Sequence, residues 1–216
     1  METTANKHDY GYSNSNAGHH HAYLLPVLLP MLHTQTERSD AKKLRVLDLG
    51  CGNGSLSNAI AQNGYEVVGI EESDSGFKFA CQSYLDCQFI QASIYDLPYS
   101  QLADAFDIVI SSEVIEHLFY PRELLKNAKK CLKPNGSLIL TTPYHGYLKN
   151  LSLAATNKMD NHFTALRDGG HIKFFSVKTL TTLLLSEGYT DINFSFAGRL
   201  PYLWKSMLCS CTPTKE

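Results

Sequence analysis

The chain has 216 residues, of which 44% are apolar and 19% charged, and its formal net charge is -2. This length accommodates one well-cored domain more readily than two, and the near-neutral charge lacks the basic footprint of a nucleic-acid-binding protein. Six cysteines without a C-x-x-C pair favour reduced thiols and a cytoplasmic location. We therefore expect a single domain, residues 1–216, and nucleic acid is disfavoured as a partner.

Residues 1–21 are rich in polar side chains and contain few aliphatic ones. Such a segment cannot support a core of its own, so we expect it to be mobile or to fold over another part of the molecule. In the second case, Tyr10 and Tyr12 would lie across a bound ligand as a lid. A disordered tail is the alternative.

Residues 22–35 are predicted to form an apolar helix. The most apolar run, residues 22–32, is eleven residues long, well short of the ~20 that span a bilayer. We therefore predict no transmembrane segment. Packing of this helix on the core is favoured, and a position in a membrane interface, with weak association to the membrane surface, is the alternative.

A predicted strand at residues 45–50 leads into a tight turn that contains Gly50, Gly52 and Gly54 and then into a helix. Glycines lack a Cβ, so backbone N–H groups here can approach a ligand at the positive end of the following helix. The next predicted strand ends in Glu71, whose carboxylate can accept hydrogen bonds from both ribose hydroxyls of a nucleoside. Together, the turn and the carboxylate predict a nucleoside pocket.

The glycine spacing differs from G-x-G-x-x-G, in which the third glycine falls one residue later and the pyrophosphate of a dinucleotide sits over the helix. Asp48, which lies inside the strand just before the glycines, suits a cationic amino-acid group better than a phosphate. A nicotinamide-dependent oxidoreductase is therefore disfavoured, and it stays as an alternative.

The predicted strands show little alternation of polar and apolar residues, and amphipathic helices separate them. This pattern predicts a parallel sheet that is covered on both faces. The predicted strands are 45–50, 66–71, 87–91, 106–112 and 137–142. The predicted helices between them are 55–63, 74–84 and 122–132. Because open α/β sheets bind ligands beyond the carboxyl ends of their strands, the polar residues at that edge form the candidate site.

Glu113, Glu116 and His117 follow the fourth of these strands at positions i, i+3 and i+4, which would place all three on one face of a helical turn. Two carboxylates and an imidazole so placed could bind a hard divalent cation. Alternatively, the histidine could act as a general base that a carboxylate orients. A pocket wall without metal is the remaining interpretation.

Beyond Pro143 the pattern changes. Residues 144–175 are predicted to be irregular, with histidines and aromatic side chains that would roof the ligand site. After His117, the candidates for a general base are His145 and His171 in this insertion, because the pKa of an imidazole lies near neutrality. Histidines exposed on a loop are the alternative.

Two of these stretches carry a family resemblance. Residues 46–54, Val-Leu-Asp-Leu-Gly-Cys-Gly-Asn-Gly, resemble the first motif of the class I S-adenosylmethionine-dependent methyltransferases. Residues 106–118 resemble the matching region of the methyltransferases related to those of ubiquinone biosynthesis, which methylate phenolic oxygens. The resemblance extends over residues 45–143 and covers little of the remainder.

The resemblance implies a doubly wound, Rossmann-like α/β fold. Its seven-stranded sheet would be mostly parallel with an antiparallel last strand, and helices would cover both faces. Residues 45–143 would be the cofactor-binding core and residues 144–175 the acceptor-side insertion. The C-terminal part, residues 176–216, would supply a helix at 177–187 and antiparallel strands at 190–197 and 203–211.

The resemblance also implies roles for individual residues. In the family, the residue that matches Glu71 holds the ribose hydroxyls, and the backbone at Gly50 and Gly52 faces the methionine part. Ser93 and Ile94 occupy the place that contacts adenine, although the acid common at the Ser93 position is absent here. The full set of expected cofactor contacts is Asp48, Gly50, Cys51, Gly52, Glu71, Ser93, Ile94 and Ser112.

The expected activity is transfer of a methyl group from S-adenosyl-L-methionine to a small-molecule acceptor, at a hydroxyl oxygen, with S-adenosyl-L-homocysteine as product. Alignment of the reactants supplies much of the acceleration in such a displacement, and an oxygen acceptor needs a base, for which His117 is the first choice. In the family, the residues that match Glu113, Glu116 and His117 are assigned to a divalent metal, so magnesium is a candidate second cofactor. A catalytically inactive cofactor-binding protein is the other alternative, and the sequence indicates neither the acceptor nor the oligomeric state.

Overall fold

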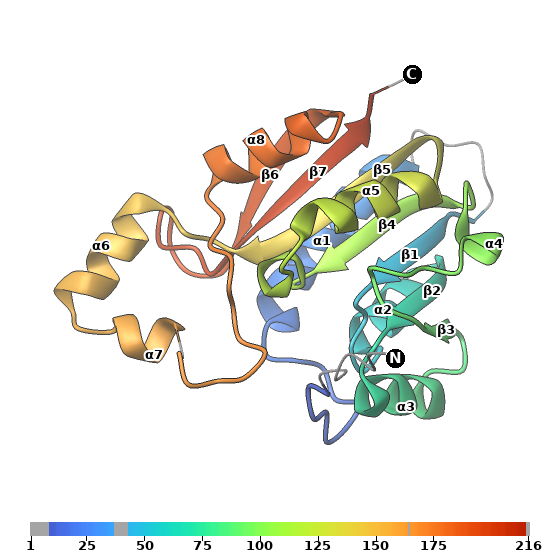
Figure 1. The fold of residues 1–216 in the computed structure, drawn as a ribbon, viewed down its shortest axis with the longest axis horizontal. Helices are drawn as coiled ribbons and strands as arrows, with labels where there is room; N and C mark the ends of the chain where they lie inside the picture. The colour runs from blue at the N-terminus through green and yellow to red at the C-terminus, as the bar shows by residue number, and fades with distance from the viewer. Residues whose placement is uncertain (1–8, 37–42, 164, 215–216) are drawn as a thin grey trace, which may run out of the picture.

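The computed structural model describes residues 9–36, 43–163 and 165–214 of the chain. Within these ranges, seven strands form one sheet in the order β3-β2-β1-β4-β5-β7-β6 (Figure 1). β7 runs antiparallel to both of its neighbours, and the strand pairs from β3 to β5 are parallel, which confirms the expected doubly wound sheet. The strands are β1 (Arg45–Leu49), β2 (Glu66–Glu71), β3 (Gln88–Gln91), β4 (Phe106–Ser112), β5 (Leu132–Pro143), β6 (Tyr189–Ala197) and β7 (Ser206–Pro213).

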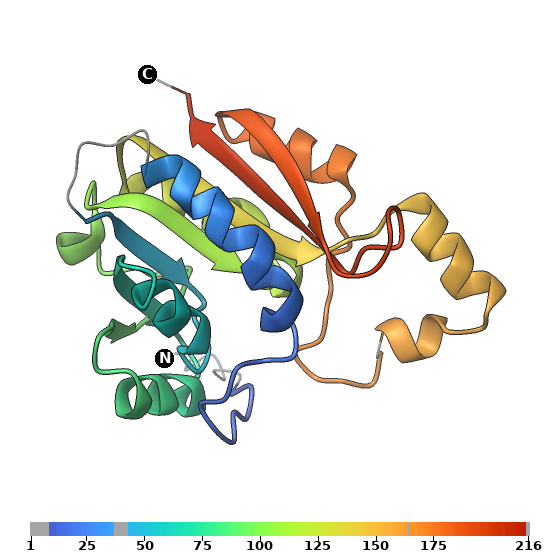
Figure 2. The ribbon, with the colours of Figure 1, turned by 180° about the vertical axis from the view of Figure 1, so that it is seen from behind.

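Helices cover both faces of the sheet (Figures 1 and 2). One face carries α1, α2 and α3, and the other carries α4, α5 and α8. Each face has its own apolar core, one beneath α1 and α2 and the other beneath α5 and α8. The bounds of these helices are α1 (His21–Thr36), α2 (Ser55–Ala61), α3 (Asp74–Ser83), α4 (Tyr99–Leu102), α5 (Pro121–Cys131) and α8 (Val177–Ser186).

Two strands differ from their predicted bounds by more than one residue. β5 begins at Leu132, because the chain pairs with Phe106 of β4 before an irregularity in the register and only then continues through residues 137–143. β7 begins at Ser206, because a turn in which the Leu203 N–H donates to the Leu200 carbonyl occupies the residues before it. Neither difference changes the order of the sheet.

Two helices occupy the segment that the sequence pattern predicts to be irregular. α6 (Tyr147–Ala155) and α7 (Met159–Phe163) follow β5 and extend beyond the sheet (Figure 1). The usual end signals do not mark α6, because Gly146 precedes it without a side-chain cap and its first turn contains no acid. Its burial is also unusual for an amphipathic helix, since the residue that it buries is Lys149.

The apolar helix near the N-terminus packs on the core. Leu24, Leu28 and Leu32 recur every four residues along α1, which places them on one face, and all three are fully buried. They belong to the same apolar cluster as Leu208 of β7. None of the helices in the described ranges combines the length and the hydropathy that crossing a bilayer requires.

Truncation of Leu28 to alanine is expected to lower the free energy of unfolding by about 2–4 kcal/mol, because it removes a fully buried side chain and leaves a cavity. Urea denaturation followed by circular dichroism measures the change. Leu148→Ala on α6 is the matched control, because that leucine is half exposed, and its effect should stay within about 0.5 kcal/mol. Equal losses for the two variants would contradict the packing of α1 on the sheet.

Candidate active site

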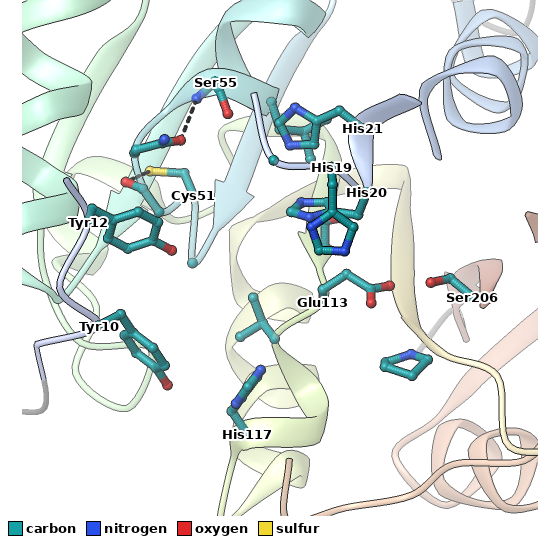
Figure 3. Close-up of a pocket in the computed structure, with 18 of the residues that line it drawn as sticks. Tyr10, Tyr12, His19, His20, His21, Cys51, Ser55, Glu113, His117 and Ser206 are labelled. Carbon is teal, nitrogen blue, oxygen red and sulfur yellow. Dashed lines mark hydrogen bonds between the residues drawn. The ribbon is translucent and has the colours of Figure 1, made fainter. Parts of the chain in front are cut away.

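A large cavity, of about 1140 Å³, lies at the carboxyl ends of β1, β2 and β4. Residues from the segment 9–20 line one side of it, where Tyr10 and Tyr12 stand beside the turn that carries Cys51 (Figure 3). Glu113 and His117, from the segment after β4, line it as well. Because the strand order reverses between β1 and β4, this edge is where doubly wound proteins bind ligands.

The glycine turn after β1 brings backbone N–H groups to the cavity. Gly50 and Gly52 have φ values of 80° and 57°, in the left-handed region that favours glycine. The N–H groups of Gly50 and Cys51 both donate to the Ile70 carbonyl at 2.9 Å, which ties the turn to β2. Gly50, Cys51 and Gly52 all line the cavity, where the sequence places its cofactor contacts.

Glu71 stands at the end of β2 and is 6% exposed. Its two carboxylate oxygens accept hydrogen bonds from the N–H groups of Gly52 and Ser73, each at 2.7 Å. Burial raises the pKa of this carboxyl above its usual range, and the two backbone donors oppose that shift. Each oxygen keeps a further lone pair for a ligand hydroxyl, so the geometry suits a ribose.

Asp48 is 1% exposed and also lines the cavity. Its Oδ2 accepts a hydrogen bond from the Ser57 hydroxyl at 2.7 Å, and its buried Oδ1 has no hydrogen-bond partner among the described residues. Burial raises the pKa of Asp48 to about 6. A buried acceptor without a partner is costly in an empty pocket, so this oxygen suits a ligand that brings its own donor.

The segment 9–20 folds over the glycine turn, which is one of the two arrangements expected for the N-terminal residues; residues 1–8 lie outside the described ranges. Asp9 accepts hydrogen bonds from the hydroxyls of Ser73 and Ser75. The side-chain amide of Asn53 donates to two carbonyls of the segment, those of Asn14 and Asn16, at 2.9 and 3.0 Å. These bonds hold the segment across the cavity.

Tyr12 in this segment packs directly on the glycine turn. A Cβ added to Gly52 would lie 2.5 Å from the Tyr12 hydroxyl, closer than real Cβ contacts allow. Tyr10 lies edge-on to His117, with ring centroids 5.9 Å apart. The two tyrosines that the sequence suggests as a lid therefore both border the cavity.

The remaining expected cofactor contacts separate into two groups. Ile94 and Ser112 line the cavity, as do Ala92 and Glu72, which the sequence did not single out. Ser93 is not among the lining residues, because its hydroxyl turns to Glu72 and donates to Oε2 at 3.1 Å.

The segment after β4 does not form the helical turn that the spacing of Glu113, Glu116 and His117 predicts. Glu113 has a left-handed backbone, with φ 55°, and only Ile115–His117 form a short 3-10 helix. The Glu113 carboxylate accepts a hydrogen bond from Thr141 at 2.9 Å. Within the described ranges, the group whose ligand atoms lie within 4.8 Å of one another is Glu116, His117 and His171.

Glu116 is 1% exposed and lies behind the cavity lining. Its Oε2 accepts a hydrogen bond from Thr142 at 3.0 Å, and its Oε1 has no hydrogen-bond partner among the described residues. The Nε2 atoms of His117 and His171 each lie 4.0 Å from Oε1. Burial and then the charge of Glu113 raise the pKa of Glu116 well above its usual range.

The three candidate base histidines occupy different surroundings. His117 and His171 line the cavity, with ring centroids 4.8 Å apart, and Nδ1 of His117 lies 2.7 Å from the carbonyl oxygen of Gly169. Burial lowers the pKa of His171 to about 4. His145 is instead packed among aromatic rings, including those of Phe163 and Phe174, and does not line the cavity.

Sequence reasoning missed a group of cations on the cavity wall formed by α6, residues 165–171 and the β6–β7 turn. The group consists of Lys149, Arg167, Arg199 and Lys205. One signal in the sequence could have pointed to these cations: basic residues occur repeatedly in residues 144–175 and after them, although the net charge of the chain is slightly negative. Their spacing in the sequence does not reveal that they converge.

The fold and the cavity define the class of protein. A glycine turn at the switch point of a doubly wound sheet, with a buried carboxylate at the end of the next strand, is the arrangement of nucleoside-binding α/β proteins. The family model of the methyltransferase domain matches residues 19–193. The chain belongs to this methyltransferase family.

Sequence relatives include ubiquinone biosynthesis O-methyltransferases. The enzyme of Caulobacter vibrioides is 36% identical over 121 residues, which cover 54% of this chain and 47% of the relative. The enzyme of Rickettsia conorii is 32% identical over 108 residues, which cover 48% of this chain and 36% of the relative. The chain therefore matches about half or less of the length of these curated relatives.

Solved structures share the fold over most of the chain. The PH0226 protein of Pyrococcus horikoshii has a TM-score of 0.69 and 21% identity, with 94% of this chain and 95% of that one covered. Magnesium protoporphyrin IX methyltransferase of Synechocystis, solved with bound S-adenosylhomocysteine, has a TM-score of 0.64 and 18% identity, with 88% and 83% covered. At these identities the likeness concerns the fold alone.

Proposed function

We propose that the protein transfers a methyl group from S-adenosylmethionine to a hydroxyl oxygen of a small-molecule acceptor. The observation that carries the proposal is the pairing of Asp48 and Glu71 across the glycine turn, two buried carboxylates in one cavity that suit the amino group and the ribose of an adenosyl amino acid. The O-methyltransferase names of the sequence relatives support an oxygen acceptor.

In this proposal, each end of the cofactor meets a different part of the turn. The unpartnered Oδ1 of Asp48 accepts from the cationic amino group, and Glu71 accepts from the ribose hydroxyls. The backbone of Gly50 and Gly52 lies against the methionine part, and Ile94 packs on the adenine. Tyr12 packs on Gly52 and borders this pocket.

His117 is the proposed general base for the acceptor hydroxyl. If Nδ1 donates to the Gly169 carbonyl, the neutral ring presents Nε2 as its proton acceptor. The histidine lines the same cavity as the glycine turn, so an acceptor between them can lose its proton as the oxygen attacks the methyl carbon. The sulfonium loses its positive charge in this step, and the product is S-adenosylhomocysteine.

The residues that the sequence suggests for a metal do not fit magnesium. Glu113 is engaged by Thr141, and the group that assembles offers two imidazoles and one carboxylate, whereas magnesium prefers oxygen ligands. We therefore propose that methyl transfer proceeds without magnesium, and we expect the activity to be unchanged when magnesium is omitted. Loss of activity in EDTA, with recovery on addition of magnesium, would contradict this.

Incubation of the purified protein with methyl-tritiated S-adenosylmethionine and either catechol or 3,4-dihydroxybenzoate tests the proposed function. We expect labelled methyl ether and an equal amount of S-adenosylhomocysteine. Binding of S-adenosylhomocysteine without turnover of any small hydroxylated acceptor would instead favour an inactive cofactor-binding protein. Hydride transfer with a nicotinamide cofactor would favour an oxidoreductase.

The affinity for S-adenosylhomocysteine is expected to fall below pH 6. Burial raises the pKa of Asp48 from 3.8 to about 6, so at lower pH a proton must leave before the carboxylate can accept the ligand ammonium group. The affinity then falls by up to about tenfold per pH unit. Calorimetry at pH 5 and pH 7 measures the effect, and Asp48→Asn should show a flatter pH dependence. Equal pH dependence in both proteins would contradict the role of Asp48.

A further inference from the structure

Four cations from three segments line the same cavity. Lys149 comes from α6, Arg167 from the segment after α7, and Arg199 and Lys205 from the turn between β6 and β7. None of the four forms an ion pair with a carboxylate of the described residues. What sets the four apart from the other cations is therefore that they line one cavity, since exposed lysines outside it, such as Lys158, form no ion pair either within the described residues.

Lys149 is the buried member of this group, at 5% exposure. Its Nζ donates to the carbonyl oxygens of Tyr144 at 2.7 Å and Lys205 at 3.4 Å, and an ammonium has three protons to donate. Burial and the charge of Arg199 lower the pKa of Lys149 to about 8, so it stays mainly charged at neutral pH. A lysine held in this way is costly to bury unless it binds an anion.

The acidic groups near this wall do not balance the four cations. Glu113 accepts a hydrogen bond from Thr141, and Glu116 lies behind the cavity lining, so the carboxyls beside this wall are fewer than its cations. Burial is the main cause that lowers the pKa of His145 and His162, and the positive charge of Lys149 is the second. The second cause is consistent with a positive potential on this wall.

We infer that the methyl acceptor carries an anionic group, a carboxylate or a phosphate, which Lys149 and Arg199 bind on this wall of the cavity. The inference rests on the proposed function and adds a substrate class to it. The cofactor itself brings a carboxylate, but its expected contacts lie at the glycine turn. A second anion, on the acceptor, accounts for the convergence of cations from three separate segments. Arg167 and Lys205 line the same cavity, and Nζ of Lys205 lies 4.7 Å from the centroid of the Tyr23 ring.

An NMR titration of the protein saturated with S-adenosylhomocysteine tests the inference. The probes are benzoate, phenyl phosphate and the neutral benzamide, which share one ring and differ in charge. We expect at least one of the anions to bind about tenfold or more tightly than benzamide, and Lys149→Met and Arg199→Gln each to remove most of that preference. The tighter anion identifies the group as a carboxylate or a phosphate.

Lys158→Met is the matched control, because Lys158 is an exposed cation of the same insertion that does not line the cavity. It should leave the preference for anions unchanged. Arg199 is exposed, so its variant keeps the test valid if the buried Lys149 cannot be replaced without loss of folding. Failure of S-adenosylhomocysteine to bind overturns the proposed function. Binding of this product without a preference for anions, or with a preference that survives both variants, overturns the present inference alone.

Discussion

Replacement of Glu71 by glutamine is expected to weaken the binding of S-adenosylhomocysteine about a hundredfold. The carboxylate already accepts from the N–H groups of Gly52 and Ser73, so the amide of glutamine must turn its NH₂ group toward one of these donors. The variant thus loses an acceptor for the ribose and disturbs the glycine turn at the same time. Loss of two hydrogen bonds to a charged group, each worth about 1.5 kcal/mol at the lower end of the usual range, gives this magnitude.

Isothermal titration calorimetry measures the change, and Glu66→Gln is the matched control. Glu66 lies at the opposite end of β2 and pairs with Arg45 at the surface, so its replacement should alter the affinity less than twofold. A Glu71→Gln protein that binds the product as tightly as the control would remove the main support for an adenosyl ligand in this cavity.

Replacement of His117 by glutamine is expected to lower kcat for a hydroxyl acceptor by about 100-fold or more, while leaving the affinity for S-adenosylhomocysteine within about threefold. General base catalysis contributes effects of this size, and glutamine retains a hydrogen-bonding group near Gly169 without accepting a proton at neutral pH. Initial rates of methyl transfer to 3,4-dihydroxybenzoate measure kcat. The pH–rate profile of the remaining activity should no longer show the inflection that the ionisation of the base produces.

His145→Gln serves as the comparison for this variant. His145 packs among aromatic rings and does not line the cavity, so its replacement should lower kcat only slightly. If the two variants lose activity equally, or if His171→Gln alone abolishes it, His117 is not the base. A large loss of cofactor affinity in His117→Gln would assign it to binding instead.

The half of the cavity at the glycine turn, where we propose that the cofactor binds, follows from local sequence rules. A strand, a glycine turn and a second strand that ends in Glu71 all fall within residues 45–71, and each is set by short-range preferences of the backbone. Parallel pairing of β1 with β2 then brings the turn and the carboxylate together. For this reason the residues alone predicted parallel strands and a pocket at this edge, whereas the strand order of the sheet came from the family resemblance.

The acceptor half depends on contacts between distant segments, which residue spacing does not reveal. The N–H groups of Ile172 and Lys173 both donate to the carbonyl oxygen of Glu116 at 2.9 Å, and this pairing places His171 beside His117. The spacing of residues 113–117 instead predicted a helical face that includes Glu113. A left-handed backbone at Glu113 prevents that face, and nothing local in the sequence announces it.

The position of the segment 9–20 bears on the rate of turnover. It crosses the rim of the cavity and is fastened at both sides, by Asp9 to the start of α3 and by Asn53 to the carbonyls of Asn14 and Asn16. If the proposed product lies in this cavity, its departure past this segment would require those hydrogen bonds to break. We expect the opening of the segment 9–20, rather than the methyl transfer step, to limit the rate of repeated turnover.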